Sequence, residues 1–190
     1  MAGPVLLAGA LMLAAILLDP WVWSRLGSPA VDQHDWGRLL RVSGSLVFWA
    51  PLALAIGLEQ RAREGGRGAG SWRLFTAPLI AGALAELLKL VIRRERPGLH
   101  EGAYVFRGFS ERLLDSHDLG FPSSHATVAF AGAAVLARLY PQAGLVGYLL
   151  AFGCAATRLL SQAHFASDVV AGALIGWAVG SWLGRGGASA

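Results

Sequence analysis

The stretch SHATVAFAGAAVLARLYPQAGLVGYLLAFGCAATRLL, residues 124–160, consists of two apolar blocks on either side of Pro141 and Gln142. Each block has about the length that a helix needs to cross a hydrocarbon core about 30 Å thick. Only helices and closed barrels satisfy the backbone in lipid, and continuous apolarity without alternation favours helices. The Gly and Ala residues in both blocks allow helices to pack closely. The stretch therefore predicts two neighbouring transmembrane helices.

Four more blocks of the same kind lie elsewhere in the 190-residue chain, which is 55% hydrophobic and only 15% charged. Soluble domains are about 25% charged, so the excess apolar surface of so short a chain must face lipid. We predict an all-α integral membrane protein, with residues 1–190 forming one six-helix transmembrane bundle. The predicted spans are residues 4–23, 42–58, 74–92, 124–140, 143–160 and 168–183.

The first block is predicted to be a retained span, because no Lys or Arg precedes it and Asp19-Pro20 follows it, unlike a cleaved signal. The net charge is +4, and the basic residues lie between apolar blocks. This pattern favours the lipid bilayer and anionic headgroups or phosphates as partners over nucleic acid. The single cysteine, Cys154, excludes a disulfide within the chain and a cysteine-based metal site.

Successive connections of a six-helix bundle alternate between the two membrane faces. The third span ends at Ile92 and the fourth begins near Ser124, while the fifth ends near Leu160 and the sixth begins at Asp168. These four ends must share one face. The unusual polar residues of the chain cluster at the same four ends, which predicts a functional site at one face of the membrane.

The first cluster is Lys89 with Arg96-Pro97. Residues seven apart share a helix face, and Pro97 biases Arg96 out of helical geometry, so Arg96 is expected at the helix end. Basic side chains that reach the membrane interface would account for this cluster taken alone.

The second cluster, Pro122-Ser123-Ser124-His125, is typical of a helix start. The free N–H groups of such an end suit a phosphate, and His125 lies within reach of it. Ser123 or Ser124 is also expected to cap the helix through its hydroxyl.

The third cluster is Arg158, His164 and Asp168. A carboxylate bonded to one ring nitrogen of a histidine leaves the other nitrogen free to attack. Alternatively, Asp168 simply stabilises a helix N-terminus. Three cations gathered in one place without matching acids are costly in a membrane, and a phosphate monoester is their natural partner. Two histidines beside it would supply a nucleophile and a proton donor.

The three motifs, Lys89-x6-Arg96-Pro97, Pro122-Ser-Ser-His125 and Arg158-x5-His164-x3-Asp168, resemble the signatures of the type 2 phosphatidic acid phosphatase family. That superfamily also includes bacterial acid phosphatases and vanadium haloperoxidases. The chain departs from the pattern in two places, since Ser124 replaces the usual Gly of the second motif and Thr157 the usual Ser of the third.

The resemblance implies a role for each matching residue. His164 would be the nucleophile that forms a phosphohistidine, Asp168 would orient it, and His125 would be the general acid. The phosphate-binding residues would be Lys89, Arg96, Ser123, Ser124 through its backbone N–H, and Arg158. No metal or other cofactor is expected, because the three cations would stabilise the charge of the phosphoryl group in place of a metal ion.

The sequence thus predicts a metal-independent phosphatase of a lipid phosphate or diphosphate, such as phosphatidic acid, phosphatidylglycerol phosphate or a polyprenyl diphosphate. Three alternatives remain open. The same site would also serve phosphate transfer to a second lipid. Ser161 or Ser123 with His164 and Asp168 would make an intramembrane serine hydrolase. A lipid-phosphate carrier would bind without turnover.

Two predictions concern the surroundings of the site. Glu86 lies three residues before Lys89 and is predicted to pair with it and set its position or charge. The polar connection 93–122 is long enough to be functional. Its residues His100, Glu101, Asp115, His117 and Asp118 are expected either to touch a lipid headgroup or to belong to an ordinary solvated loop.

For orientation, the basic loop with Arg61, Arg63, Arg67 and Arg73 favours the cytoplasmic side. The active face would then lie outside the cytoplasm, on a bacterial inner membrane. The number of basic residues in the loops of the opposite face is larger and opposes this orientation. We expect the 93–122 loop to use its basic residues for substrate. The opposing residues are Arg25, Arg38, Arg41, Arg93, Arg94, Arg107 and Arg112. The sequence specifies no oligomeric state.

Overall fold

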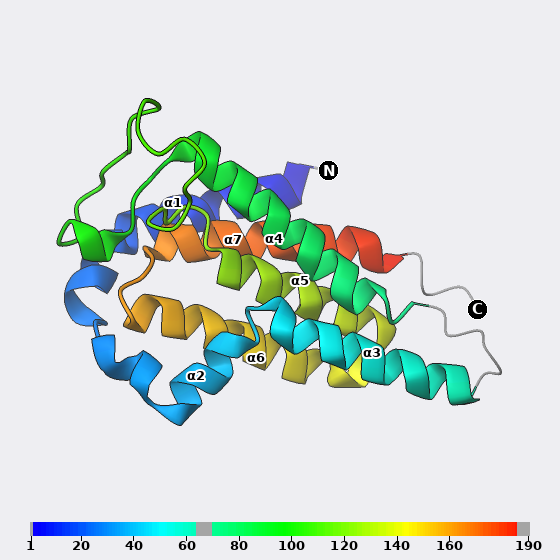
Figure 1. Cartoon of the computed structure of the whole chain (residues 1–190). Coiled ribbons are helices and arrows are strands. Elements are labelled where there is room, and N and C mark those ends of the chain that lie inside the picture. The colour runs from blue at the N-terminus through cyan, green and yellow to red at the C-terminus, as the bar shows by residue number, and fades with distance from the viewer. Residues whose placement is uncertain (1, 64–69, 186–190) are drawn as a thin grey trace.

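The structure, a computed structural model, describes residues 2–63 and 70–185 (Figure 1). Within these ranges the chain forms helices and no strand, so the all-α prediction is confirmed. The long helices are α1 (Ala2–Arg25), α2 (Asp35–Val42), α3 (Leu46–Arg63), α4 (Arg73–Ile92), α5 (Ser124–Leu139), α6 (Pro141–Leu160) and α7 (Ala166–Gly184). Two short 3-10 helices, η1 (Pro29–Gln33) and η2 (Pro97–Leu99), lie in the connections.

Each predicted span coincides with one helix, and α1, α4, α6 and α7 are individually long and apolar enough to cross a membrane. The bounds of the second span were wrong. Val42 ends α2, and the chain bends by 64° before α3 begins. The hydroxyls of Ser43 and Ser45 donate to the carbonyls of Leu40 and Val42, at 2.7 and 2.9 Å. Such local bonds compete with helical continuation. With α2 and α3 counted as one bent span, the number of candidate spans within the described residues reaches five.

The helix α5 is the centre of the bundle and packs against α4, α6 and α7. Every residue from Ala126 to Val135 is buried, and most of them are small. This composition explains why α5, with only 16 residues, sits inside the protein while longer helices surround it. The outer contacts join α1 to α7, α2 to α6 and α3 to α4.

Glycines of α7 bring its backbone directly against α5. A Cβ at Gly176 would lie 2.1 Å from the carbonyl oxygen of Thr127, and one at Gly180 would lie 2.3 Å from that of Ala131. No side chain fits at such distances, so both positions require glycine for the helices to approach this closely. The close approach fixes where the first turn of α7 lies relative to the first turn of α5.

We expect Gly176→Val to separate α5 from α7 and to lower the melting temperature of the detergent-purified protein strongly. Overpacking in a tightly packed interior costs about 1–3 kcal/mol or more, and here the obstacle is backbone that cannot step aside. Gly9→Val in α1 is the matched control, since a Cβ there would meet nothing within 4 Å. Equal melting temperatures for the two variants would contradict this account of the helix contact.

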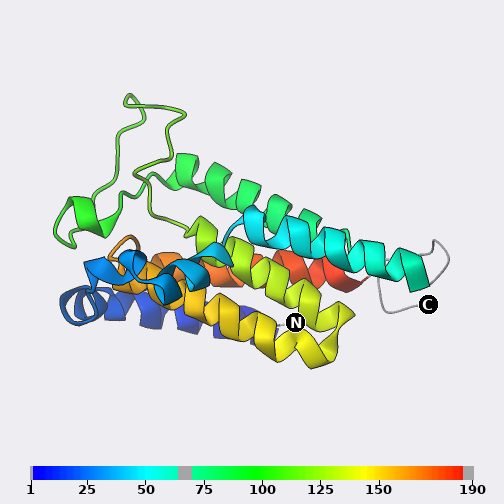
Figure 2. The ribbon, with the colours of Figure 1, turned by 60° about the horizontal axis from the view of Figure 1, so that its bottom comes forward.

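The predicted common face is confirmed. In Figure 1, α4 and α6 end, and α5 and α7 begin, at the left-hand end of the bundle, whereas α1 begins and α7 ends at the right. The 93–122 connection lies at the same end of the bundle in both views, and part of it rises above the helices (Figure 2). Two isolated bridges, Arg94 to Phe106 and Glu95 to Leu119, tie this connection to itself.

Candidate active site

His164 lies in the short turn between α6 and α7 and is buried. Its Nδ1 is 2.9 Å from the carbonyl oxygen of Gly120 and 3.6 Å from Oδ2 of Asp168. A carbonyl oxygen only accepts hydrogen bonds, so Nδ1 carries the proton in this geometry and Nε2 keeps its lone pair. Asp168 therefore faces His164 as predicted, but the shorter contact belongs to Gly120.

The surroundings of His164 favour its neutral form. Burial lowers the pKa of His164 below its ordinary value, because the imidazolium would lose hydration. Asp168 opposes this shift, while the charges of Arg96 and Arg158 add to the lowering. A neutral imidazole with a free Nε2 is the form that a nucleophile requires.

Asp168 is fully buried in the first turn of α7 and accepts hydrogen bonds on both oxygens. Oδ2 accepts from the backbone N–H of Phe165 at 2.8 Å, which stabilises the helix N-terminus. Oδ1 accepts from the guanidinium of Arg94, with Nε at 3.1 Å. The helix-capping interpretation of Asp168 is thus confirmed. The carboxylate also faces His164, but at 3.6 Å, while the hydrogen bond of Nδ1 goes to Gly120.

Arg94 was missed as a site residue by the sequence analysis, which counted it only among the loop cations. It is buried, binds Asp168, and donates through Nη2 to the hydroxyl of Ser167 at 2.8 Å. Its guanidinium also lies 4.7 Å from the ring centroid of Phe121 and 5.1 Å from that of Tyr104. Its position five residues after Lys89, inside the first motif, was the available signal.

A second missed residue is Asp19, near the end of α1. Its Oδ1 accepts from the backbone N–H of Ser167 at 2.9 Å, and its Oδ2 accepts from the hydroxyls of Ser167 and Tyr104. Burial, together with the bond to Asp19, raises the pKa of Tyr104 to about 12. The first helix is thereby connected to Arg94 and Asp168 through Ser167.

Arg96 does not continue the α4 helix, so the expected shared helix face with Lys89 is wrong. The helix ends at Ile92, where Arg93 takes a left-handed conformation with φ of 58°. Arg96 is extended, with φ −70° and ψ 143°, as the following proline favours. It still returns to the site, because its charge acts on both Lys89 and His164.

Three of the predicted phosphate ligands have a buried polar atom without a hydrogen-bond partner within the described residues. These atoms are Nε of Arg96, Oγ of Ser123 and Nη1 of Arg158. Buried donors are nearly always paired, because an unpaired one loses the free energy of its hydration. An anion with several acceptor oxygens, such as a phosphate, would satisfy all three.

The hydroxyl of Ser123 makes no capping bond to α5, so the predicted capping role is wrong for this residue. Its backbone N–H donates to the carbonyl oxygen of Asp168 at 3.0 Å, which joins the starts of α5 and α7. A Cβ at Gly172 would lie 2.5 Å from the carbonyl oxygen of Ser123, so this glycine lets α7 come close to the residue.

Arg158 lies in the last turn of α6 and is held from two sides. Its Nη2 donates to Oγ of Ser161 at 2.7 Å and lies 3.4 Å from Oδ2 of Asp32. Asp32, a third residue that the sequence analysis missed, belongs to η1 and also pairs with Arg41 at 3.2 Å. Because Ser161 is engaged by Arg158, the arrangement gives little support to a Ser161–His164 hydrolase. Nη1 of Arg158 is buried and has no partner among the described residues.

His125 lies in the first turn of α5 and is partly exposed. The charges of Arg158, His164, Arg41 and Lys89 act on it, so it lies near residues of all three motifs. In residues 2–63 and 70–185, no three His, Cys, Asp or Glu side chains lie close enough together to hold a metal ion.

The predicted pairing of Glu86 with Lys89 is confirmed, with Oε1 of Glu86 2.8 Å from Nζ of Lys89. The carboxylate also accepts from the hydroxyl of Ser116 at 2.6 Å and from that of Ser124. The hydroxyl of Ser124 thus binds Glu86, which leaves its backbone N–H as its available donor. Glu86 connects α4, the start of α5 and the 93–122 loop.

The 93–122 loop is organised by its own arginines, so the expectation that these bind substrate is wrong for Arg93 and Arg107. Arg93 is buried and donates to the carbonyls of Arg107 and Gly108 at 3.1 and 2.9 Å. Arg107 binds Glu95 at 2.7 Å. Contact with His100, and then with Arg107, holds the pKa of Glu95 below its usual range.

Of the remaining loop residues singled out in the sequence, His117 pairs with Asp118 at 2.9 Å and is largely exposed. The pairing lowers the pKa of Asp118. Asp115 accepts from the backbone N–H of His117 at 2.9 Å, and Glu101 is exposed. These are the contacts of a solvated loop, the second of the two expectations for this segment.

Comparison with known proteins gives several similarities. The family model of the PAP2 superfamily matches residues 70–186. The chain is 38% identical over 107 residues to the lipid A 1-phosphatase of Rhizobium etli, over 55% of this chain and 45% of that protein. It is 35% identical over 139 residues to the decaprenylphosphoryl-5-phosphoribose phosphatase of Mycobacterium tuberculosis, over 71% of this chain and 69% of that one.

Among solved structures, the PAP2-type phosphatidylglycerolphosphate phosphatase from Bacillus subtilis superposes with a TM-score of 0.48 at 18% identity, over 93% of this chain and 94% of that chain. The chain spans less than half the length of the curated lipid A phosphatases that it matches. The family model, in contrast, covers well over half of this chain and contains every motif residue described above. The chain therefore belongs to the PAP2 superfamily, as the three motifs predicted.

Proposed function

We propose that this protein is a metal-independent lipid phosphatase that works through a phosphohistidine on His164. The observation that carries the proposal is the set of unpartnered buried donors on Arg96, Ser123 and Arg158, in the same three motifs as a histidine whose Nδ1 is already bonded. Donors arranged in this way before the substrate arrives stabilise the charge of a phosphoryl transition state.

In the proposed reaction, Nε2 of His164 attacks the phosphorus and the bond to the lipid oxygen breaks. His125 gives its proton to the leaving lipid alkoxide. The cations Lys89, Arg96 and Arg158 hold the phosphoryl oxygens, and Glu86 fixes the direction of Lys89. A water molecule then attacks the phosphorus and gives one proton to His125. The bond from phosphorus to Nε2 breaks, and inorganic phosphate leaves.

The substrate class that fits best is a membrane lipid with a terminal phosphate or diphosphate. The relatives named above are phosphatases of lipid A and of a decaprenylphosphoryl sugar phosphate. Both names place the phosphate on a lipid-linked molecule, and the site lies at the end of a bundle of apolar helices. Phosphatidic acid, phosphatidylglycerol phosphate, a polyprenyl diphosphate and phosphorylated lipid A are the members to test.

The test is phosphate release by the purified full chain in detergent, with EDTA present, from each of these four lipids. We expect release from at least one lipid, and a large loss in Arg158→Met, which removes one of the unpartnered donors. Arg112→Met is the control, since the Arg112 side chain is 65% exposed in the loop. Release that requires an added divalent metal, or no release from a folded protein, would overturn the proposal.

The pH dependence should follow the lowered pKa of His164. Protonation of His164 removes the nucleophile, so activity is lost as the pH falls, but only below the ordinary histidine value of about 6.5. The measurement is kcat/KM against pH, with the titration of the substrate phosphate determined separately by phosphorus NMR. An acidic limb centred at or above the ordinary value contradicts a His164 that is buried as neutral imidazole.

We propose further that the site faces away from the cytoplasm, on a bacterial inner membrane. Arg93, Arg94 and Arg107 are buried within the loop, so they are poor candidates for the basic residues that orient a membrane protein. The exposed or half-exposed arginines of the opposite end are Arg61, Arg63, Arg73, Arg138 and Arg185. On the site face, those exposed are Arg25, Arg38, Arg41 and Arg112. The test is a phosphatase reporter that is active only outside the cytoplasm, fused after Ala190. We expect this fusion to be inactive, and an active fusion would contradict the orientation.

A further inference from the structure

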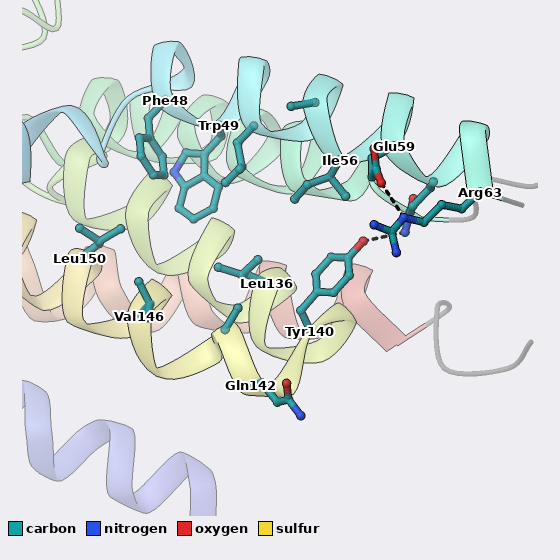
Figure 3. A pocket seen from close by; sticks show the side chains of 14 residues that line it. Phe48, Trp49, Ile56, Glu59, Arg63, Leu136, Tyr140, Gln142, Val146 and Leu150 are labelled. Carbon is teal, nitrogen blue, oxygen red and sulfur yellow. Dashed lines mark hydrogen bonds and ion pairs between the residues drawn. The ribbon is translucent and has the colours of Figure 1, made fainter.

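A groove of about 910 Å³ opens between α3 and the α5–α6 pair. Its walls come from α3, from the last turn of α5 and from the first half of α6, and no residue of the candidate active site lines it. Figure 3 shows Phe48 and Trp49 at one end and Glu59, Arg63 and Gln142 at the other. The wall between these ends is almost entirely apolar, so the groove has one polar end and one apolar end.

The dimensions of the groove match one leaflet of a bilayer. Phe48 and Gln60 both line it, and twelve residues of helix span about 18 Å. Half of a hydrocarbon core is about 15 Å. The polar end lies at the bundle end opposite the candidate active site, where α3 ends and α6 begins. The groove therefore runs from that membrane surface to the middle of the hydrocarbon core.

The polar end has an unsatisfied hydrogen-bonding group. The amide of Gln60 donates to the hydroxyl of Tyr140 at 2.6 Å, while its Oε1 is buried with no described partner. If the amide is turned over, its nitrogen becomes the unpartnered atom instead. A buried amide is nearly always fully bonded, so this one indicates a polar group that reaches the end of the groove. Beside it, Arg63 binds Glu59 through Nε and its side chain is 78% exposed.

We propose that this groove holds one acyl chain of a membrane phospholipid from the leaflet opposite the active face. The chain lies along the apolar wall from Ile56 to Phe48, the ester or headgroup bonds the amide of Gln60, and the phosphate lies beside Arg63. The groove opens sideways into the hydrocarbon core of the bilayer, where the surrounding molecules are lipid acyl chains. This lipid is a resident ligand and not a substrate, because no residue of the candidate active site lines the groove.

The test is native mass spectrometry of the full chain released from nanodiscs of phosphatidylethanolamine and phosphatidylglycerol. We expect one phospholipid retained on the wild type and about tenfold less on Val146→Trp, whose ring would displace several methylenes from the groove. Leu145→Trp is the matched control, since Leu145 is exposed on the same helix but does not line the groove. Gln60→Leu keeps the apolar wall and should weaken retention by removing the polar anchor.

Three results would overturn the proposal. Equal lipid retention by the wild type, Val146→Trp and Gln60→Leu would mean that the groove holds nothing specific. A Val146→Trp variant that is monomeric where the wild type is dimeric would assign the groove to a second copy of the chain. A raised KM for a lipid phosphate in Val146→Trp, with phospholipid retention unchanged, would assign the groove to the chain of the substrate.

Discussion

Replacing His164 by alanine should abolish phosphate release, with kcat falling by about four orders of magnitude or more, as when a covalent nucleophile is removed from other enzymes. The reason is that the cations of the site bind the substrate but cannot form the bond to phosphorus. The variant should therefore still bind a lipid phosphate. Single-turnover phosphate release and equilibrium binding of the same lipid, measured side by side, check both statements.

The matched control for this prediction is His117→Ala, because His117 is 84% exposed on the 93–122 loop. It should keep its full activity and melting temperature. Labelling from a radioactive lipid phosphate should give an acid-labile phosphoprotein in the wild type and none in His164→Ala. A His164→Ala protein that folds and releases phosphate at more than about a hundredth of the wild-type rate would point to another nucleophile.

Much of the fold was predictable because lipid imposes a simple rule on sequence. Each span had to be a run of apolar residues of fixed length, and all six runs coincide with helices. The bend between α2 and α3 was not predictable in the same way. It depends on the hydroxyls of Ser43 and Ser45, which donate to backbone carbonyls of the preceding turn. Hydropathy does not show whether such side-chain bonds form in place of helical backbone bonds.

The motif residues of the candidate site were predictable because their residue types and spacing match those required for phosphate binding and phosphoryl transfer. What remained hidden was the set of partners that hold those residues in place. Asp19 and Asp32 come from segments that the motifs do not include, and Arg94 is one of the unspecified positions inside the first motif. Each contacts a site residue or its immediate neighbour only after the chain folds. A single sequence shows a charged residue in an apolar block, but it does not show which distant charge faces it.

The arginines of the long loop illustrate the same point in reverse. From sequence, Arg93, Arg94 and Arg107 were cations without partners, and a substrate seemed the natural partner. In the structure, backbone carbonyls, Asp168 and Glu95 take that place. Because each guanidinium has five donors in a fixed fork, one buried arginine can hold several carbonyls of an irregular loop at once. The loop is therefore stabilised from within, and its rigidity is available to position Gly120 against His164.

Arg94→Met should destabilise the protein more than any other single change in the loop. Methionine replaces most of the volume, but Asp168, which is fully buried, would lose its cation. Leaving one charge of a buried pair without its partner costs about 3–5 kcal/mol. In a chain of this length each kcal/mol lowers the melting temperature by about 2–4 °C, so a loss of roughly 10 °C is expected. Thermal unfolding of the detergent-purified variant measures it, with the exposed Arg112→Met as control.

Activity separates a positioning role of Arg94 from a purely structural one. In the double variant Arg94→Met/Asp168→Asn the buried charge is gone, so much of the lost melting temperature should return. Phosphate release should not return, because the carboxylate that faces His164 and that Arg94 holds in place is no longer there. Recovery of both stability and activity in the double variant would mean that His164 is held by Gly120 alone. Recovery of neither would mean that Arg94 acts mainly through Ser167 and the aromatic rings that surround it.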